Sequence, residues 1–185
     1  PTTVPEAKID PATATVYDED FEDVEPGTKS TACVNEDTPD PEGLRRWILR
    51  SFSDDNNTGK DYLEVVDSST LPTGNSAVGK RVLKCHRQAN SKSWQGAMIN
   101  LSKKLEGGAT YRVSFTAYSE VSSLNFNEQV IPIEGGEQSY AYMPTRITAT
   151  RWKTTKGQWK DFNYEITVPD DMYLSLIHIS EPTRH

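Results

Sequence analysis

The chain has 185 residues, of which 35% are hydrophobic, and a formal net charge of -7. This size suits one domain with flanking tails, and the acidic balance disfavours a nucleic-acid backbone or a membrane surface as partner. No run of 18 or more apolar residues occurs in the sequence, so no segment of it is predicted to span a membrane. With 4 Trp and 8 Tyr, the composition favours a neutral, polar ligand.

Residues 1–16 are rich in Pro, Thr and Ala without periodicity, which is typical of a linker. The chain starts without Met, and we expect it to be part of a longer polypeptide. Residues 17–173 are predicted to form the domain. Within it, 28–40 and 52–60 are acidic and turn-rich and are predicted loops, while 44–51 could be a short strand or one helical turn.

The pattern after residue 60 is that of short strands. Residues 111–118 alternate apolar positions (Tyr111, Val113, Phe115) with polar ones, and 159–168 alternate in the same way. Turn signals separate the segments, and no long helical period occurs. The sequence therefore predicts an all-β, two-sheet antiparallel sandwich (a jelly roll) with strands near 62–66, 82–86, 97–101, 111–118, 126–133, 140–143, 147–152 and 159–168.

The C-terminal segment departs from this pattern. Residues 174–185 resemble the translation of a sequencing adapter, so we predict that they are a non-native tail and exclude them from the fold. The alternative is a native last strand over 174–179, because most of these residues are apolar.

The chain has two cysteines, Cys33 and Cys85. They could form a disulfide, or Cys85 could be a small buried residue within its strand, and the sequence leaves both readings open. The three histidines show no metal-ligand spacing.

Trp94 lies in a polar segment that enters a predicted strand, where a core residue is not expected. Its ring can stack on the C–H face of a pyranose while its N–H donates a hydrogen bond, and a tryptophan that covers the core is the competing interpretation. Tyr118 is out of phase with the core residues of its strand. Tyr140 and Tyr142 share one face of theirs and offer a second aromatic surface.

Arg50 and Arg87 could hydrogen-bond sugar hydroxyls, although a solvated surface arginine explains either one taken singly. Trp47, Trp152 and Trp159 have apolar neighbours, and we interpret them as core or sheet-edge packing. No nucleophile elbow, phosphate-binding loop, zinc spacing or helical His-Glu motif occurs. With 27 acidic residues in the chain, a pair of carboxylates is easy to find and is no evidence for a glycosidase. Since no other catalytic motif occurs, the sequence favours a binding module over an enzyme.

Six segments, in this order, resemble a family of carbohydrate-binding modules: the xylan-binding family 22 type and the related family 4/9 type. They are DFED at 20–23, WILRS at 47–51, GKRVLKCHR at 79–87, SWQGAMINL at 93–101, LEGGATYRVSFTAY at 105–118 and GQWKDFNYEITVP at 157–169. The likeness covers 17–173. It implies a galactose-binding-domain-like jelly roll whose concave face binds β-1,4-xylan or a related β-glucan.

The resemblance also implies roles for single residues. Trp94 would be the stacking aromatic and Arg50 the groove arginine, and Tyr142, Tyr140 or Tyr118 would be the groove tyrosine. The late Tyr-x-x-x-Glu groove pair of the family is missing from this chain, and only Tyr173 could remain of it.

A structural Ca²⁺ is implied as well, with Asp20 and Glu22 as one half of its ligands. The second half, expected near the C-terminus, is also missing.

The resemblance implies a non-catalytic module of an endo-1,4-β-xylanase. We therefore expect a monomer, secreted or at the cell surface, that binds polysaccharide for a tethered catalytic domain and has no nucleic-acid or membrane partner. Two other functions stay open: a structural or adhesion sandwich that packs against a neighbouring domain, and a small β-sandwich hydrolase.

Overall fold

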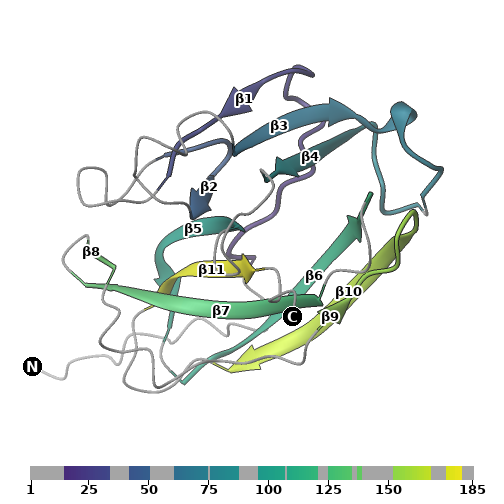
Figure 1. Ribbon diagram of the computed structural model, residues 1–185. Helices are drawn as coiled ribbons and strands as arrows, with labels where there is room; N and C mark the ends of the chain where they lie inside the picture. Colours follow the sequence, from purple (N-terminus) through teal and green to yellow (C-terminus); the bar gives the residue numbers. More distant parts are fainter. Residues whose placement is uncertain are drawn as a thin grey trace, which may run out of the picture.

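The computed structural model describes residues 15–33, 42–50, 61–74, 76–87, 96–106, 108–120, 125–134, 137–138, 152–167 and 174–180. This part of the chain is built from eleven strands and one short 3₁₀ turn, η1 (Ser68–Thr70) (Figure 1). None of its helices is long and apolar enough to cross a membrane. The predicted all-β class is confirmed.

The strands form one large sheet and two small ones. The large sheet has the order β2-β5-β11-β7-β8, with β9 also paired to β7. Its strands are β2 (Trp47–Arg50), β5 (Gly96–Leu105), β7 (Asn125–Glu134), β8 (Glu137–Gln138), β9 (Trp152–Lys153) and β11 (Leu174–Ser180).

The first small sheet has the order β1-β3-β4, and the second pairs β10 with β6. Every pairing between these strands is antiparallel. Their bounds are β1 (Lys29–Ser30), β3 (Tyr62–Asp67), β4 (Arg81–His86), β6 (Thr110–Tyr118) and β10 (Trp159–Thr167).

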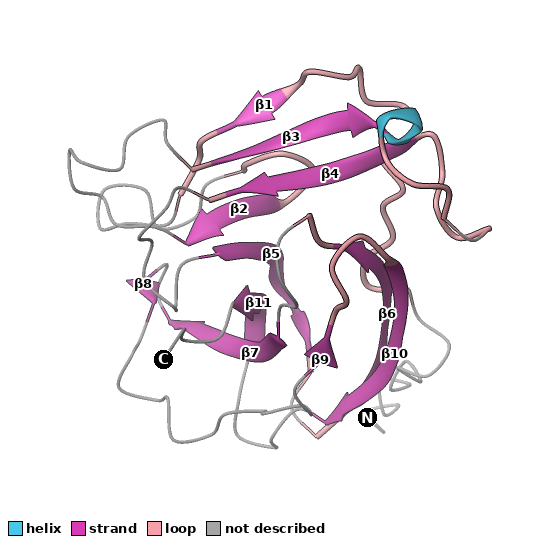
Figure 2. Ribbon diagram, turned by 45° about the vertical axis from the view of Figure 1, so that its right-hand side comes forward, coloured by secondary structure: helices cyan, strands magenta, loops and turns pink. Residues whose placement is uncertain are grey.

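Both small sheets pack against the same face of the large sheet, which makes the fold a two-layer sandwich (Figures 1 and 2). One core cluster joins Leu63 and Val65 of β3 to Leu49 of β2 and Ala97 of β5. A second joins Tyr111 of β6 and Ile166 of β10 to Ile99 of β5. Since Ala97 and Ile99 are two residues apart on one strand, they lie on the same face. The predicted antiparallel β-sandwich is confirmed.

The observed strands agree with the alternation in the sequence. The segments predicted at 62–66, 82–86, 111–118, 126–133 and 159–168 are strands, and 97–101 is the first half of a longer one. The open choice at 44–51 resolves to a strand. The strand predicted at 140–143 lies outside the described residues.

Residues Leu174–Ser180 form β11, which pairs with β5 on one side and with β7 on the other. This arrangement agrees with the alternative prediction that residues 174–179 form a last strand. The segment that we excluded from the fold is thus a strand, and its mostly apolar residues suit a place between two neighbouring strands. The non-native origin of residues 174–185 stays a prediction.

Neither reading of the cysteines is observed. Cys33 and Cys85 do not form a disulfide, and Cys85 is exposed rather than buried. By register Cys85 pairs with the core residue Leu63, so it lies on the core-facing side of β4. The thiol stays exposed because β4 is the last strand of its sheet.

A tight turn at Arg45-Arg46 leads into β2. Leu44 and Trp47 exchange two backbone hydrogen bonds of 2.9 Å around it, and both central residues have positive φ, 51° and 68°. A two-residue hairpin turn of this kind favours Asn-Gly, because side chains other than Asn, Asp and Gly are strained at positive φ. Two carboxylates from the N-terminal turn hold Arg45 in place: Asp23 Oδ2 at 2.8 Å and Glu19 Oε2 at 3.8 Å.

Arg46→Gly is expected to raise the free energy of unfolding by about 1 kcal/mol, because glycine adopts positive φ without steric cost. Arg112→Gly is the control, since it removes an exposed arginine within β6 at ordinary φ, and it is expected to destabilise the protein. Urea unfolding followed by circular dichroism measures both changes. A loss of stability in both variants would contradict strain at Arg46.

Candidate functional site

Ile48 of β2 and Met98 of β5 lie on the face of the large sheet that points away from the core, since their neighbours Leu49 and Ala97 belong to the core cluster. We call this the outer face. Backbone register aligns Arg50 of β2, Gly96 of β5, Ser180 of β11 and Asn127 of β7 in one row across the large sheet. Trp94 lies two residues before Gly96 in the chain, in a segment outside the described residues. The register therefore places Arg50 beside β5, the strand that Trp94 precedes in the chain.

Two residues further along the strands, backbone register aligns Ile48, Met98, His178 and Gln129 in another row. Ile48 and Met98 have no exposed surface, and Gly96 in the row before is also buried. The outer face is therefore covered at these positions. Its binding chemistry is expected at the Arg50 end of β2.

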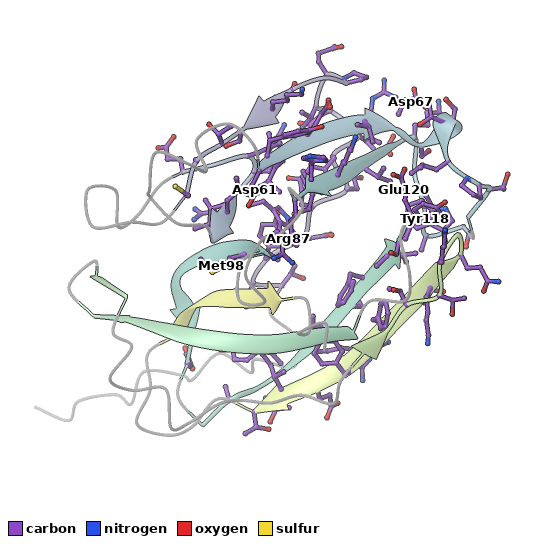
Figure 3. All side chains as sticks on the ribbon, viewed as in Figure 1. Asp61, Asp67, Arg87, Met98, Tyr118 and Glu120 are labelled. Carbon is purple, nitrogen blue, oxygen red and sulfur yellow. The ribbon has the colours of Figure 1, made fainter. Side chains whose placement is uncertain are left out.

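The remaining predicted site residues are spread over the molecule. Tyr140 and Tyr142 lie outside the described residues, as Trp94 does. Arg87 is half-buried directly after β4, and Tyr118 ends β6 on the far side of the sandwich, clearly apart from Arg87 (Figure 3). The structure thus does not bring Tyr118 to Arg87.

Tyr118 contacts Trp159 instead, with ring centroids 5.3 Å apart and planes tilted by 39°. These two residues are cross-strand partners at the end of the β6–β10 ribbon. The indole Nε1 of Trp159 donates a 2.8 Å hydrogen bond to the carbonyl of Pro72. Trp159 is half-buried at this sheet end, which agrees with the predicted sheet-edge packing.

A second ring pair lies on the exposed side of the β1-β3-β4 sheet, and sequence reasoning missed it. Tyr62 and His86 stack with centroids 4.7 Å apart, and Lys29 Nζ lies 4.5 Å from the Tyr62 ring. Because His86 covers one ring face of Tyr62 and Lys29 lies over the ring, this pair is a poor surface for sugar stacking. The stacking of Tyr62 on His86 depends on the register between β3 and β4, so a reading of either segment alone could not reveal this pair.

The acidic opening turn is held together by its own carboxylates. Asp20 Oδ1 accepts the N–H of Glu22 at 3.0 Å, and Glu22 Oε1 accepts the N–H of Arg81 at 3.0 Å. Glu22 Oε1 also lies so close to Gly79 that a Cβ there would collide with it. Phe21, between the two, is buried at a positive φ of 62°. This turn thus ties the N-terminal segment to the start of β4.

The calcium site implied for Asp20 and Glu22 stays a prediction. Among the described residues, no group of three or more His, Cys, Asp or Glu side chains is placed to hold a metal ion. If the site exists, Ca²⁺ added to chelator-treated protein will raise the melting temperature, and Asp20→Asn will weaken that effect. An unchanged melting temperature in millimolar Ca²⁺ would contradict it.

The pKa values of Tyr17 and Asp67 are shifted, and hydrogen bonds fix both side chains. Burial raises the pKa of the Tyr17 hydroxyl, and the charge of Glu19 adds to this, so Tyr17 stays protonated and donates to the Arg45 carbonyl at 2.8 Å. Hydrogen bonding to Ser69 lowers the pKa of Asp67, and Arg81 adds to this. Asp67 thus stays ionised as the N-cap of η1.

The strand pairing and the two core clusters define an antiparallel β-sandwich domain. A family model described as carbohydrate binding domain (CBM 4/9) matches residues 14–177. The chain belongs to this family of carbohydrate-binding modules, and it is a non-catalytic module. No curated protein matches the chain.

Solved structures similar to this chain share its fold. The tandem CBM22-1–CBM22-2 domain of Paenibacillus barcinonensis Xyn10C is 20% identical, with a TM-score of 0.54 over 94% of this chain and 44% of that one. The CBM22-2 xylan-binding domain of the same enzyme is 20% identical, with a TM-score of 0.51 over 85% of both chains.

The Clostridium thermocellum CBM22-1–GH10 modules of endo-1,4-β-D-xylanase 10B, complexed with xylohexaose, are 18% identical to this chain. The TM-score is 0.52 over 85% of this chain. The chain covers 26% of that protein's length.

Proposed function

We propose that this module binds β-1,4-xylan, or mixed-linkage β-glucan, and holds a linked endo-1,4-β-xylanase domain on plant cell-wall polysaccharide outside the cell. The family match supports carbohydrate binding, and the names of the similar structures support xylan. The observation that carries the proposal for this chain is the pairing of Arg50 with Gly96, which sets a cationic residue beside the strand that Trp94 precedes.

The chemistry of these two residues suits a neutral sugar chain. An indole ring offers a flat apolar surface to the C–H face of a pyranose, and a guanidinium donates several hydrogen bonds to hydroxyls. Each contact is weak, because the sugar exchanges bonds with water for bonds with protein. We expect dissociation constants of roughly 10 µM to 1 mM, equivalent to about 4 to 7 kcal/mol.

Weak binding is sufficient for a tethered module. Once the module holds the polymer, the linked catalytic domain meets its substrate at a high effective concentration. Cleavage is then limited by the reach of the linker rather than by diffusion through solution.

Affinity electrophoresis in soluble xylan tests the proposal. The wild-type protein is expected to be retarded, and Trp94→Ala or Arg50→Ala should lose most of the retardation while keeping the wild-type circular dichroism spectrum. Arg46→Ala is the matched control, because it removes the same charge from the turn that begins β2, and it should migrate like the wild type. Unretarded wild-type protein in both xylan and mixed-linkage glucan would refute the proposal.

A further inference from the structure

The outward side of the β6–β10 ribbon carries a continuous series of polar side chains. Nine residue pairs follow one another in register from Trp159↔Tyr118 to Thr167↔Thr110, without a bulge. The inward positions, among them Tyr111, Phe162 and Ile166, are buried. Every second pair therefore points outward, and we call these five pairs the outer ladder: Thr110–Thr167, Arg112–Glu165, Ser114–Asn163, Thr116–Asp161 and Tyr118–Trp159.

The polar part of the outer ladder is open to solvent. The side chains of Arg112 and Glu165 are 69% and 62% exposed, and their ion-pair distance is 3.7 Å. Thr116 Oγ1 donates to Asp161 Oδ1 at 2.7 Å. Hydroxyl, amide and charged groups thus follow one another along the ribbon of β6 and β10, whose two strands lie side by side in Figure 2.

The composition of the outer ladder selects an uncharged polar ligand. The ladder has one guanidinium, that of Arg112, and two carboxylates, those of Asp161 and Glu165. It therefore lacks the field of a single sign that a polyanion or polycation would require. Its hydroxyl, amide and charged groups include both donors and acceptors, which match sugar hydroxyls. At one end stand Tyr118 and Trp159, half-buried aromatic rings that can pack against a pyranose.

The dimensions agree with a polymeric ligand. Nine residues of antiparallel strand extend over roughly 27 Å, which is long enough for several sugar units of an extended chain. The unbroken register keeps the outward side chains in a regular row. A short oligosaccharide would contact only part of this row, whereas a polymer could contact all of it.

We propose that the outer ladder is a second carbohydrate-binding surface, for an extended β-linked polysaccharide chain, on the opposite side of the sandwich from the outer face. It rests on the proposed function in assuming that the module binds such polymers. Two surfaces on opposite sides would let one module contact two neighbouring chains of a cell-wall polysaccharide, which raises retention by avidity.

The experiment compares a polymer with a short ligand. Retention on insoluble xylan is measured by depletion, and binding of xylohexaose by calorimetry, for wild type, Trp94→Ala, Tyr118→Ala and Ser114→Lys. Tyr62→Ala is the control, because it also removes a half-buried tyrosine from the outward side of a small sheet. Circular dichroism and size-exclusion chromatography establish that each variant is folded and show its oligomeric state.

Ser114→Lys is expected to weaken retention on insoluble xylan roughly 3- to 10-fold and to leave xylohexaose binding unchanged, and Tyr118→Ala is expected to weaken that retention by a similar factor. Tyr62→Ala should change neither quantity. Trp94→Ala is expected to keep part of its retention on insoluble xylan. The double variant Trp94→Ala/Tyr118→Ala is expected to lose that remaining retention.

The other outcomes overturn the inference. Wild-type retention in both ladder variants would show that the ladder does not contact the polymer, while the proposed function would stand. Dissociation of a dimer by Ser114→Lys would make the ladder an interface between copies. Wild-type protein that binds neither ligand would refute the proposed function itself.

Discussion

Deletion of residues 174–185 is expected to convert the protein to aggregates. The deletion removes β11, which pairs on both sides within the large sheet, and so exposes the backbone donors and acceptors of β5 and β7. Two unpaired strand edges of this length recruit other chains. Size-exclusion chromatography with light scattering of freshly purified protein measures the outcome.

Deletion of residues 181–185 is the matched control, because it shortens the same end of the chain and leaves β11 in place. This shorter deletion is expected to remain soluble and to melt as the full chain does. If the longer deletion behaved in the same way, β11 would contribute nothing to the sheet, and the prediction that 174–185 form a non-native tail would gain support.

Leu63→Ala is expected to lower the free energy of unfolding by roughly 3 kcal/mol. Leu63 has no exposed surface and lies in the cluster that joins β3 to β2 and β5. Its truncation would leave a cavity between the two layers, and the surrounding strands can close it only in part. Urea unfolding followed by tryptophan fluorescence measures the loss.

Cys85→Ala is the control for this core variant. Cys85 is the cross-strand partner of Leu63 but is exposed, so its truncation is expected to change stability by less than about 0.5 kcal/mol. Equal losses in the two variants would contradict the placement of the core between the layers.

Strand positions were predictable from the sequence wherever one face of a strand is buried. In β6 and β10 the apolar residues alternate with polar ones because the ribbon covers the core with one side and meets solvent with the other. The same alternation predicted that Tyr118 points away from the core. It could not predict Trp159 as its partner, because register depends on where the distant strand begins.

Burial was less predictable than strand position, because it depends on neighbours in space. Trp47 and Trp159 both have apolar sequence neighbours, yet Trp47 packs against the core cluster and Trp159 ends a ribbon. Cys85 follows the apolar pattern of β4 and still meets solvent at the last strand of its sheet.

The sequence did not show how the candidate site residues are arranged. The pairing of Arg50 with Gly96 depends on the register between β2 and β5, which the order of the motifs does not encode. Arg87 and Tyr118, chosen as single polar or aromatic residues, lie apart because no local pattern encodes which sheet a strand joins. The roles of Trp94, Tyr140 and Tyr142 stay predictions.

The hydrogen bond from Trp159 to Pro72 has a consequence for how binding could be observed. It connects the loop between η1 and β4, which leads into the β1-β3-β4 sheet, to the β6–β10 ribbon. A ligand that displaced the ring of Trp159 would break this bond and loosen the two sheets from each other. The emission of this indole would then change, and the protein would report occupancy of the ribbon without an attached label.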